Sequence, residues 1–287
     1  MQGDAEAQVG AWVEYFRDIG VHDFYRRGEP APQAASETEA VTATPDAAVE
    51  SGRPFANEVP STPPIAESFS MPPVKLISFN ELAPVPQDAI PAADREAGLR
   101  AIQEEIGDCT RCPLAYAGRR KIVFGDGPAT ARLMFVGEGP GADEDAQGLP
   151  FVGKAGQLLN NMIGAMGLAR AEVYIANIVK CRPPGNRVPE PAEANTCAQF
   201  LLRQIDVLRP EAIVALGATA ATYLLGVKQS LGSLRGRWHR CRGAKLAVTY
   251  HPAFLLRDPR QKAEAWKDLQ MVMRELGLTP PAPKTKT

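Results

Sequence analysis

The chain has 287 residues, of which 45% are hydrophobic, and its formal net charge is −1. No apolar run approaches the roughly 18 residues of a membrane-spanning helix, so we expect none. Met1 is not followed by a basic and then an apolar stretch, so we expect no secretory signal and a cytoplasmic protein.

The small net charge hides a division along the chain. Residues 1–96 carry 16 acidic and 6 basic side chains, a balance of −10, whereas residues 97–287 carry 17 and 26, a balance of +9. A basic globular body with an acidic arm is typical of a nucleic-acid-binding protein. Ordinary variation of surface charge is the alternative.

The first part of the chain has little apolar periodicity. Residues 1–27 form the exception, because apolar side chains recur there at helical spacing and predict a short amphipathic helical segment. Its partner is either the main domain or another protein. Residues 28–94 are rich in Pro, Ala, Glu, Ser and Thr, so we predict a disordered acidic linker that buries too little surface to offset its ordering entropy.

Residues 95–277 have the pattern of a globular domain, followed by a disordered tail over 278–287. Apolar runs predict four strands, at 131–137, 173–180, 211–217 and 245–251. Helices are predicted between them, at 96–107, 155–167, 190–208 and 259–276, with a short one after 217. This alternation predicts an α/β fold with a mostly parallel sheet, whose functional site lies beyond the carboxyl ends of the strands.

The loop after the first predicted strand reads "GEGPGADEDAQGLPFVGKAG". A Gly-rich turn in this place usually binds phosphate, but Glu138, Asp143, Glu144 and Asp145 would repel a phosphate group. The G-x-x-x-x-G-K-[ST] pattern is also absent, which argues against a phosphate-binding nucleotide hydrolase. We therefore expect this loop to hold a group other than phosphate.

Five cysteines are present, an odd number that argues against a disulfide framework. Cys109 and Cys112 form a C-x2-C pair, and Cys181 and Cys197 follow far downstream. A zinc ribbon normally brings two such pairs, whereas one pair and two separate thiolates suit the four corners of a 4Fe–4S cluster. Zinc and buried core cysteines are the alternatives, and Cys241 is expected to be free.

Four motifs occur in order: the opening loop, "NIVKCRPPGNRVPEPAEANTC", "LRGRWH" and "YHPAFLLR". Together with the cysteine spacing, they resemble the family 4 uracil-DNA glycosylases, the iron–sulfur type, over residues 95–277. The resemblance implies a three-layer α/β/α sandwich with a mostly parallel four-stranded central sheet, and a 4Fe–4S cluster. It also implies a monomer that hydrolyses the N-glycosidic bond of deoxyuridine in single- or double-stranded DNA.

Such an enzyme flips the nucleotide out of the stack and encloses the base. The resemblance implies that Glu138 stabilises the cationic sugar and orients water, and that His251 donates to the uracil oxygen that gains charge. Asn177 would read the uracil edge and Phe151 would stack on the base. Backbone at three successive residues would approach the base and sugar: Gly139, Pro140 and Gly141.

Gly141 stands where better-known uracil glycosylases carry a thymine-excluding tyrosine, so Glu144 is the candidate for that task. The region after the second strand lacks the histidine of a covalently trapping relative, so we expect turnover. Leu255 or Leu256 would wedge into the duplex, with side-chain packing as the alternative. Four basic residues either bind DNA phosphates or are ordinary surface charge: Arg182, Arg187, Arg257 and Arg260.

Two other functions stay open at this point. The first is a glycosylase of broader specificity, acting on hypoxanthine or xanthine. The second is a non-enzymatic iron–sulfur protein that binds DNA or senses redox state.

Overall fold

The computed structural model describes residues 77–280. The helical segment predicted for residues 1–27 lies outside the described residues, as do most of the predicted linker and residues 281–287. Within the described part, no helix is long and apolar enough to cross a membrane.

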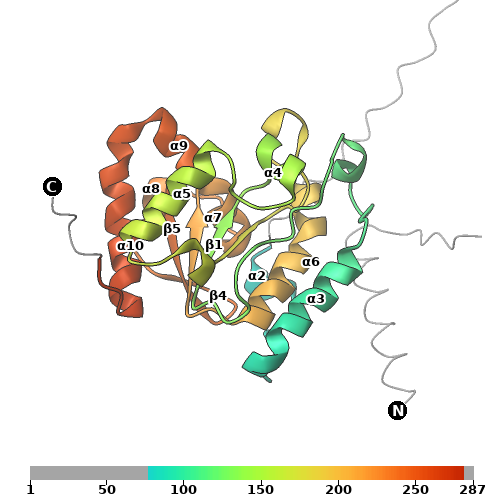
Figure 1. Ribbon diagram of the computed structural model, residues 1–287, viewed down its shortest axis with the longest axis horizontal. Helices are drawn as coiled ribbons and strands as arrows, with labels where there is room; N and C mark the ends of the chain where they lie inside the picture. Colours follow the sequence, from blue (N-terminus) through green and yellow to red (C-terminus); the bar gives the residue numbers. More distant parts are fainter. Residues whose placement is uncertain (1–76, 281–287) are drawn as a thin grey trace, which may run out of the picture. The chain divides into compact units, whose positions relative to one another are not determined.

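The centre of the fold is a sheet in the strand order β2-β1-β3-β5-β4 (Figure 1). Four strands are parallel and match the predicted ones: β1 (Leu133–Gly137), β2 (Tyr174–Asn177), β3 (Ala212–Leu216) and β5 (Ala244–Thr249). The predicted count of four was wrong, because β4 (His239–Cys241) adds a fifth, antiparallel strand at the edge.

The edge strand β4 is too short to show a period of two in the sequence. It pairs with β5 through the two-residue turn Arg242-Gly243, whose φ angles are 50° and 84°. Positive φ at both turn residues is the geometry that matches the twist of a hairpin. Only the turn could have predicted this strand, and its first residue is arginine where Asn or Gly is usual, so the hairpin was not recognised.

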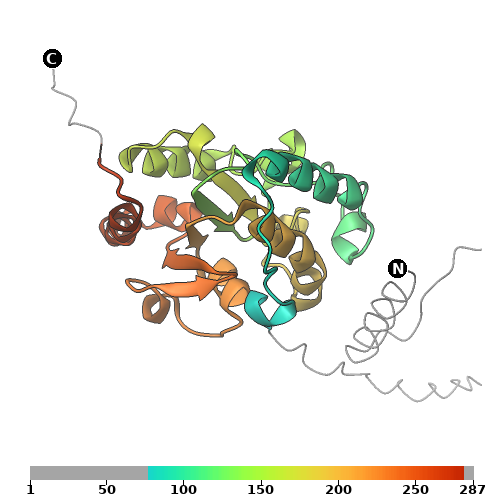
Figure 2. The same cartoon turned by 90° about the horizontal axis from the view of Figure 1, so that it is seen from below.

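Two layers of helices cover the sheet (Figures 1 and 2). On one face, α5 (Lys154–Ala165) and α10 (Lys262–Leu276) pack against Leu133, Phe135 and their neighbours. On the other face, α3 (Arg95–Ile106), α6 (Pro191–Leu208) and α7 (Ala218–Leu225) pack against Met134 and Val136. The three-layer α/β/α sandwich is thus confirmed.

Short helices and 3-10 turns complete the described chain. The short α-helices are α2 (Phe79–Leu82), α4 (Ala142–Gln147), α8 (Leu231–Leu234) and α9 (Pro252–Arg257). The 3-10 turns are η1 (Ala92–Asp94), η2 (Pro113–Tyr116), η3 (Arg170–Glu172), η4 (Pro184–Asn186) and η5 (Pro259–Gln261).

Residues 77–94 belong to the predicted linker, yet they pack on the domain. Phe79 is 1% exposed and lies in the hydrophobic core. The buried guanidinium of Arg242 donates to the main-chain carbonyls of Phe79 and Pro84 and pairs with Asp206. The domain therefore begins well before residue 95, because one aromatic anchor and one arginine hold a segment whose composition alone predicts disorder.

Candidate active site and four-cysteine centre

The loop after β1 is held by its own acids. The Glu144 carboxylate accepts main-chain N–H bonds from Gly141 at 3.0 Å, Val152 at 2.9 Å and Gly153 at 3.1 Å. Asp145, 2% exposed, accepts from the Arg120 N–H at 2.9 Å. These two acids shape the loop, which explains their presence in a Gly-rich turn. The thymine-excluding role of Glu144 stays a prediction.

Phe151 occupies a strained backbone conformation beside the site. Its φ is 53°, and its side chain is 6% exposed. Gly156 permits this path, since a methyl group there would lie 1.9 Å from the Phe151 carbonyl oxygen. Arg170 donates to the same carbonyl at 3.1 Å. A non-glycine residue with positive φ persists only where its surroundings fix it, and such residues cluster at functional sites.

Asn177 ends β2 and is 1% exposed. Its side-chain oxygen Oδ1 is buried without a hydrogen-bond partner among the described residues. A methyl group at Gly137 would lie 2.4 Å from this oxygen and 2.6 Å from Phe151 Cζ, so glycine is what allows the two side chains to meet there. A buried acceptor without a donor is rare in native proteins, and it marks a place where a ligand can supply the donor.

His251 lies just before α9, beyond the end of β5. Its Nδ1 accepts the main-chain N–H of Ala253 at 3.1 Å, so the proton of the neutral ring is on Nε2. Burial lowers the pKa of His251 to about 4, and the charge of Arg257 adds to this effect. The ring is therefore neutral at pH 7 and offers an Nε2–H donor. Its centroid lies 5.6 Å from that of the Phe151 ring.

Glu138 follows β1 in a segment that is bonded to the end of β2. The Gly137 and Glu138 carbonyls accept the N–H groups of Ile178 and Val179 at 2.9 and 3.2 Å. The Glu138 carboxylate forms no ion pair with the described residues.

The sequence analysis missed Tyr223 of α7. Burial raises the pKa of Tyr223, and the nearby Glu138 charge adds to that effect. A tyrosine on an apolar helix gave no signal of this neighbour.

Three loop residues expected to approach the base lie next to Glu138. Pro140 is buried, and Gly139 and Gly141 are partly buried. A methyl group at Gly139 would lie 2.8 Å from Val179 Cγ2, and one at Gly141 would lie 2.7 Å from Glu144 Oε2. A side chain at either position would therefore force Val179 or the Glu144 carboxylate to move.

The residues expected to bind DNA differ in their surroundings. Arg187 forms a two-bond ion pair with Glu193, at 2.8 and 2.7 Å, so its guanidinium is largely committed within the protein. Arg182 donates to the Asn186 side chain at 2.7 Å, and Arg260 pairs with Asp258. Arg257 is exposed and forms no ion pair with the described residues.

The sequence left the wedge open between Leu255 and Leu256, and the structure shows that the two leucines differ in exposure. Leu255 is 1% exposed, whereas Leu256 is 44% exposed. In α9 the two side chains point in different directions, and Leu255 faces the protein interior. Of the two, Leu256 is the one whose side chain lies at the surface, and the wedge role itself stays a prediction.

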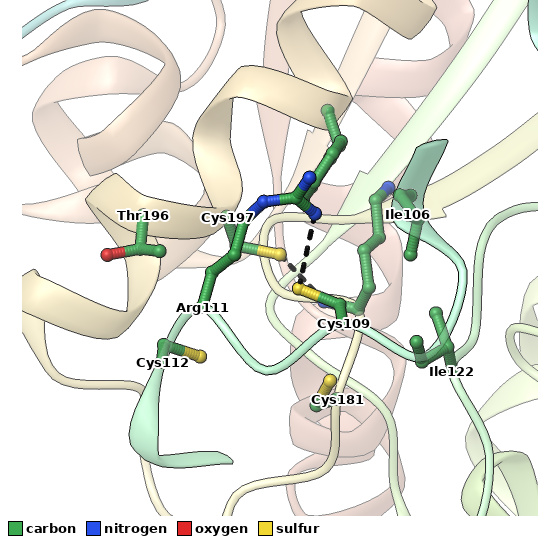
Figure 3. Close-up of a pocket in the computed structure, with 10 residues that line it drawn as sticks. Ile106, Cys109, Arg111, Cys112, Ile122, Cys181, Thr196 and Cys197 are labelled. Carbon is green, nitrogen blue, oxygen red and sulfur yellow. Dashed lines mark hydrogen bonds between the residues drawn. The ribbon is translucent and has the colours of Figure 1, made fainter. Parts of the chain in front are cut away.

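Four cysteines from three segments of the chain meet at one small cavity (Figure 3). Cys109 and Cys112 lie in the loop after α3, Cys181 follows β2, and Cys197 is in α6. Figure 3 shows their sulfur atoms directed toward a shared space. The structure thus brings the four predicted ligands together. The fifth, Cys241, is buried in β4, does not line this cavity and is a free thiol.

The surroundings of these thiols favour negative charge on sulfur. Arg119 donates to Cys181 Sγ at 3.4 Å, Arg111 to Cys109 Sγ at 3.6 Å, and the Lys180 N–H to Cys197 Sγ at 3.3 Å. Burial opposes the effect of these hydrogen bonds, because it disfavours the charged thiolate, and it raises the pKa of Cys197 to about 12. A metal would remove this barrier, since coordinating thiols lose their protons.

The donor set fits an iron–sulfur cluster. Four cysteines and no carboxylate line the cavity; the other lining residues are apolar Ile106, Ile122 and Phe200, basic Arg111 and Lys180, and Thr196. Cysteine thiolates are the ligands that such clusters take, and basic side chains nearby would balance their negative charge. Among residues 77–280, no group of three or more His, Cys, Asp or Glu is placed to hold a single metal ion.

The fold is an α/β/α sandwich whose carboxyl sheet edge brings the Asn177 amide, the Phe151 ring and the His251 ring together. The sequence profile of the uracil DNA glycosylase superfamily matches residues 124–270. The chain belongs to this superfamily and, within it, to the type-4 group.

Three curated relatives of the type-4 group show the extent of the similarity. The chain is 46% identical to the type-4 uracil-DNA glycosylase of Thermotoga maritima over 168 residues, which cover 57% of this chain and 86% of the relative. It is 42% identical to the Pyrobaculum aerophilum type-4 enzyme, covering 60% and 92% of the two chains. For the Saccharolobus solfataricus type-4 enzyme the identity is 40%, with coverage of 63% and 88%. The family resemblance seen in the motifs is confirmed.

Proposed function

We propose that this chain excises uracil from DNA by hydrolysing its N-glycosidic bond, leaving an abasic site. The observation that carries the proposal is the buried, unpaired Oδ1 of Asn177 beside the rings of Phe151 and His251. Similarity to the type-4 uracil-DNA glycosylases supports the same function.

Asn177 has the hydrogen-bonding pattern that uracil requires. Oδ1 would accept from uracil N3–H, and the amide nitrogen would donate to the O4 carbonyl. Cytosine has no proton at N3 and carries an amino group at C4, so it would leave both amide atoms badly paired. An unpaired buried polar group costs about 1–3 kcal/mol, which is enough for strong discrimination. Phe151 would support the base by stacking.

Glu138 and His251 would act on opposite charges in one transition state. Breaking the bond leaves positive charge on the sugar and negative charge on uracil. His251 Nε2–H is a neutral donor held in place by the Ala253 N–H, and it would stabilise the uracil anion. Glu138 would stabilise the sugar cation and orient the water that adds to C1′. The proton from this water leaves on Glu138 or solvent, and uracil takes up a proton after release.

We also propose that Cys109, Cys112, Cys181 and Cys197 hold a 4Fe–4S cluster. The four sulfurs come from three segments, so a bound cluster would supply a covalent link between the α3 loop, the end of β2 and helix α6. Zinc is the alternative occupant, and metal analysis separates the two. Iron and inorganic sulfide in about equal amounts are expected for the cubane.

DNA binding would use the face around α9. Arg257 and Leu256 are exposed in α9, the helix that begins just after His251, and they are suited to a phosphate contact and to filling the space left by the flipped base. Arg182 is a second phosphate candidate. The Glu193 ion pair makes Arg187 a weaker one.

The proposal is tested with single-stranded and duplex oligonucleotides that contain one uracil, hypoxanthine or xanthine, followed by alkaline cleavage of abasic sites. We expect several turnovers on uracil and no covalent protein–DNA product. Preferred cleavage of hypoxanthine or xanthine would establish the broader glycosylase instead. Binding without cleavage of any substrate would establish a non-enzymatic DNA-binding protein.

A further inference from the structure

Lys180 lies between the four cysteines and the base-reading asparagine, and its side chain is buried. It is 1% exposed, immediately precedes Cys181 and follows Asn177 by three residues. Its ammonium forms no ion pair with a carboxylate within residues 77–280. A buried lysine without a counter-charge is unusual and calls for an explanation.

The two ends of Lys180 contact the two sites. Its main-chain N–H donates to Cys197 Sγ at 3.3 Å. Its ammonium donates to the main-chain carbonyl of Asn177 at 3.2 Å and to Gln204 Oε1 at 2.6 Å. Lys180 therefore forms hydrogen bonds both to a cysteine of the four-cysteine cavity and to the residue proposed to read uracil.

The acceptors around the ammonium are neutral and fixed. Gln204 is fully buried, and its amide nitrogen donates to the Phe124 carbonyl at 3.0 Å and to the Tyr174 hydroxyl at 3.1 Å. Neither Gln204 nor the Asn177 carbonyl carries charge to balance the ammonium. Lys180 lines the cavity of the four cysteines, so thiolates bound to a metal would supply the missing negative charge.

We propose that Lys180 is a positioning residue that couples the metal centre to uracil recognition. Its ammonium fixes the end of β2, and hence the Asn177 amide, while the charge of the centre holds the ammonium in place. This inference rests on the proposed function, since it assumes both a loaded cluster and a uracil-binding Asn177. It predicts that uracil in the pocket is sensed at the cluster, and that the coupling is reciprocal.

The test compares wild type with Lys180→Met, which keeps the length of the side chain and removes its charge. The matched control is Lys228→Met, at an exposed lysine. Three quantities are measured: iron per chain, the visible circular dichroism of the cluster with and without saturating free uracil, and the inhibition constant of uracil. For wild type and the control, we expect uracil to change the visible spectrum.

For Lys180→Met, we expect the spectral response to uracil to disappear and the inhibition constant to rise about tenfold or more, because a charge-assisted hydrogen bond is lost. The single-turnover rate at saturating DNA should change less than the inhibition constant. A coloured Lys180→Met protein with wild-type inhibition and a wild-type spectral response would overturn the inference.

A second variant covers the case in which Lys180→Met does not fold. Gln204→Met removes the other acceptor of the ammonium and should reduce the spectral response while leaving the cluster bound. A wild-type spectrum that does not respond to saturating uracil would overturn the inference without any variant. Failure of the proposed function is distinct: the wild-type protein would then be colourless or would leave uracil in DNA.

Discussion

Gly137 and Asn177 are register partners at the carboxyl ends of β1 and β2, and a methyl group on the glycine would lie 2.4 Å from Asn177 Oδ1. Phe151 Cζ would lie 2.6 Å from the same methyl group. The absence of a side chain at one residue thus sets the positions of the amide and the ring. Both distances are shorter than a real methyl contact allows, so a side chain at residue 137 would force Asn177 or Phe151 to move.

Gly137→Ala should therefore damage uracil recognition. The added methyl must displace Asn177 or Phe151, and we expect the single-turnover rate on uracil to fall about tenfold or more, since overpacking costs about 1–3 kcal/mol. The matched control is Gly164→Ala in α5, where a methyl group would meet nothing within 4 Å. It should stabilise the helix by roughly 0.5–1 kcal/mol and leave activity unchanged. Equal rates for both variants would contradict this picture of the pocket.

The lowered pKa of His251 predicts that the folded protein loses stability in acid. Burial lowers its pKa from the ordinary 6.5 to about 4 in the folded protein. The unfolded chain therefore takes up the proton first, so the contribution is fully present above pH 6.5 and is lost as the pH falls toward 4. The loss is at most about 3 kcal/mol. Chemical denaturation at a series of pH values should show it in wild type and less of it in His251→Gln; parallel curves would refute the assignment.

Glu138→Gln keeps the size of the side chain and removes its charge. Because the sugar cation loses its counter-charge, we expect the single-turnover rate at saturating DNA to fall about 10²–10³-fold. Affinity for DNA should stay the same or improve, since one acid near the phosphates is gone. Rapid-quench kinetics and a binding titration measure the two effects separately. A variant that loses only affinity, at an unchanged saturated rate, would show that Glu138 is not catalytic.

Serine substitutions can distinguish the proposed cluster cysteines from the free cysteine. Cys197→Ser should lose iron, colour and thermal stability together, because one corner of the cluster loses its ligand. Cys241→Ser is the control: Cys241 is also buried but lies in β4 and does not line the cavity. It should retain iron and colour even where packing is weakened. A colourless wild-type protein with zinc and full activity would contradict the iron–sulfur assignment.

The sequence predicted the parts of the fold that repeat a local pattern. The apolar run at Leu133–Gly137 and the helical spacing within Lys154–Ala165 both led to the elements that the structure has. The site loops could be located too, since the carboxyl ends of parallel strands share one edge. Four cysteines at one cavity likewise agree with their spacing.

Features that depend on tertiary contacts could not be predicted from the sequence. Phe79 is a single aromatic in a segment whose composition predicts disorder, and only its contact with the core reveals the packing. Leu255 and Leu256 are adjacent and chemically identical, so the direction of the helix face decides which is buried. Lys180 would be expected at the surface, and only the structure shows that its ammonium is enclosed.

The central claim is that a buried amide at position 177 selects uracil for excision. Its most direct test is the single-turnover rate on duplex DNA containing one uracil, measured at saturating protein for wild type, Asn177→Ala and Asn161→Ala, the last removing an exposed asparagine from α5. We predict that wild type and Asn161→Ala cleave uracil at similar rates, and that Asn177→Ala is slower by about tenfold or more, since at least one buried hydrogen bond is lost. Uracil excision by Asn177→Ala at the wild-type rate, with cytosine still rejected, would contradict the claim.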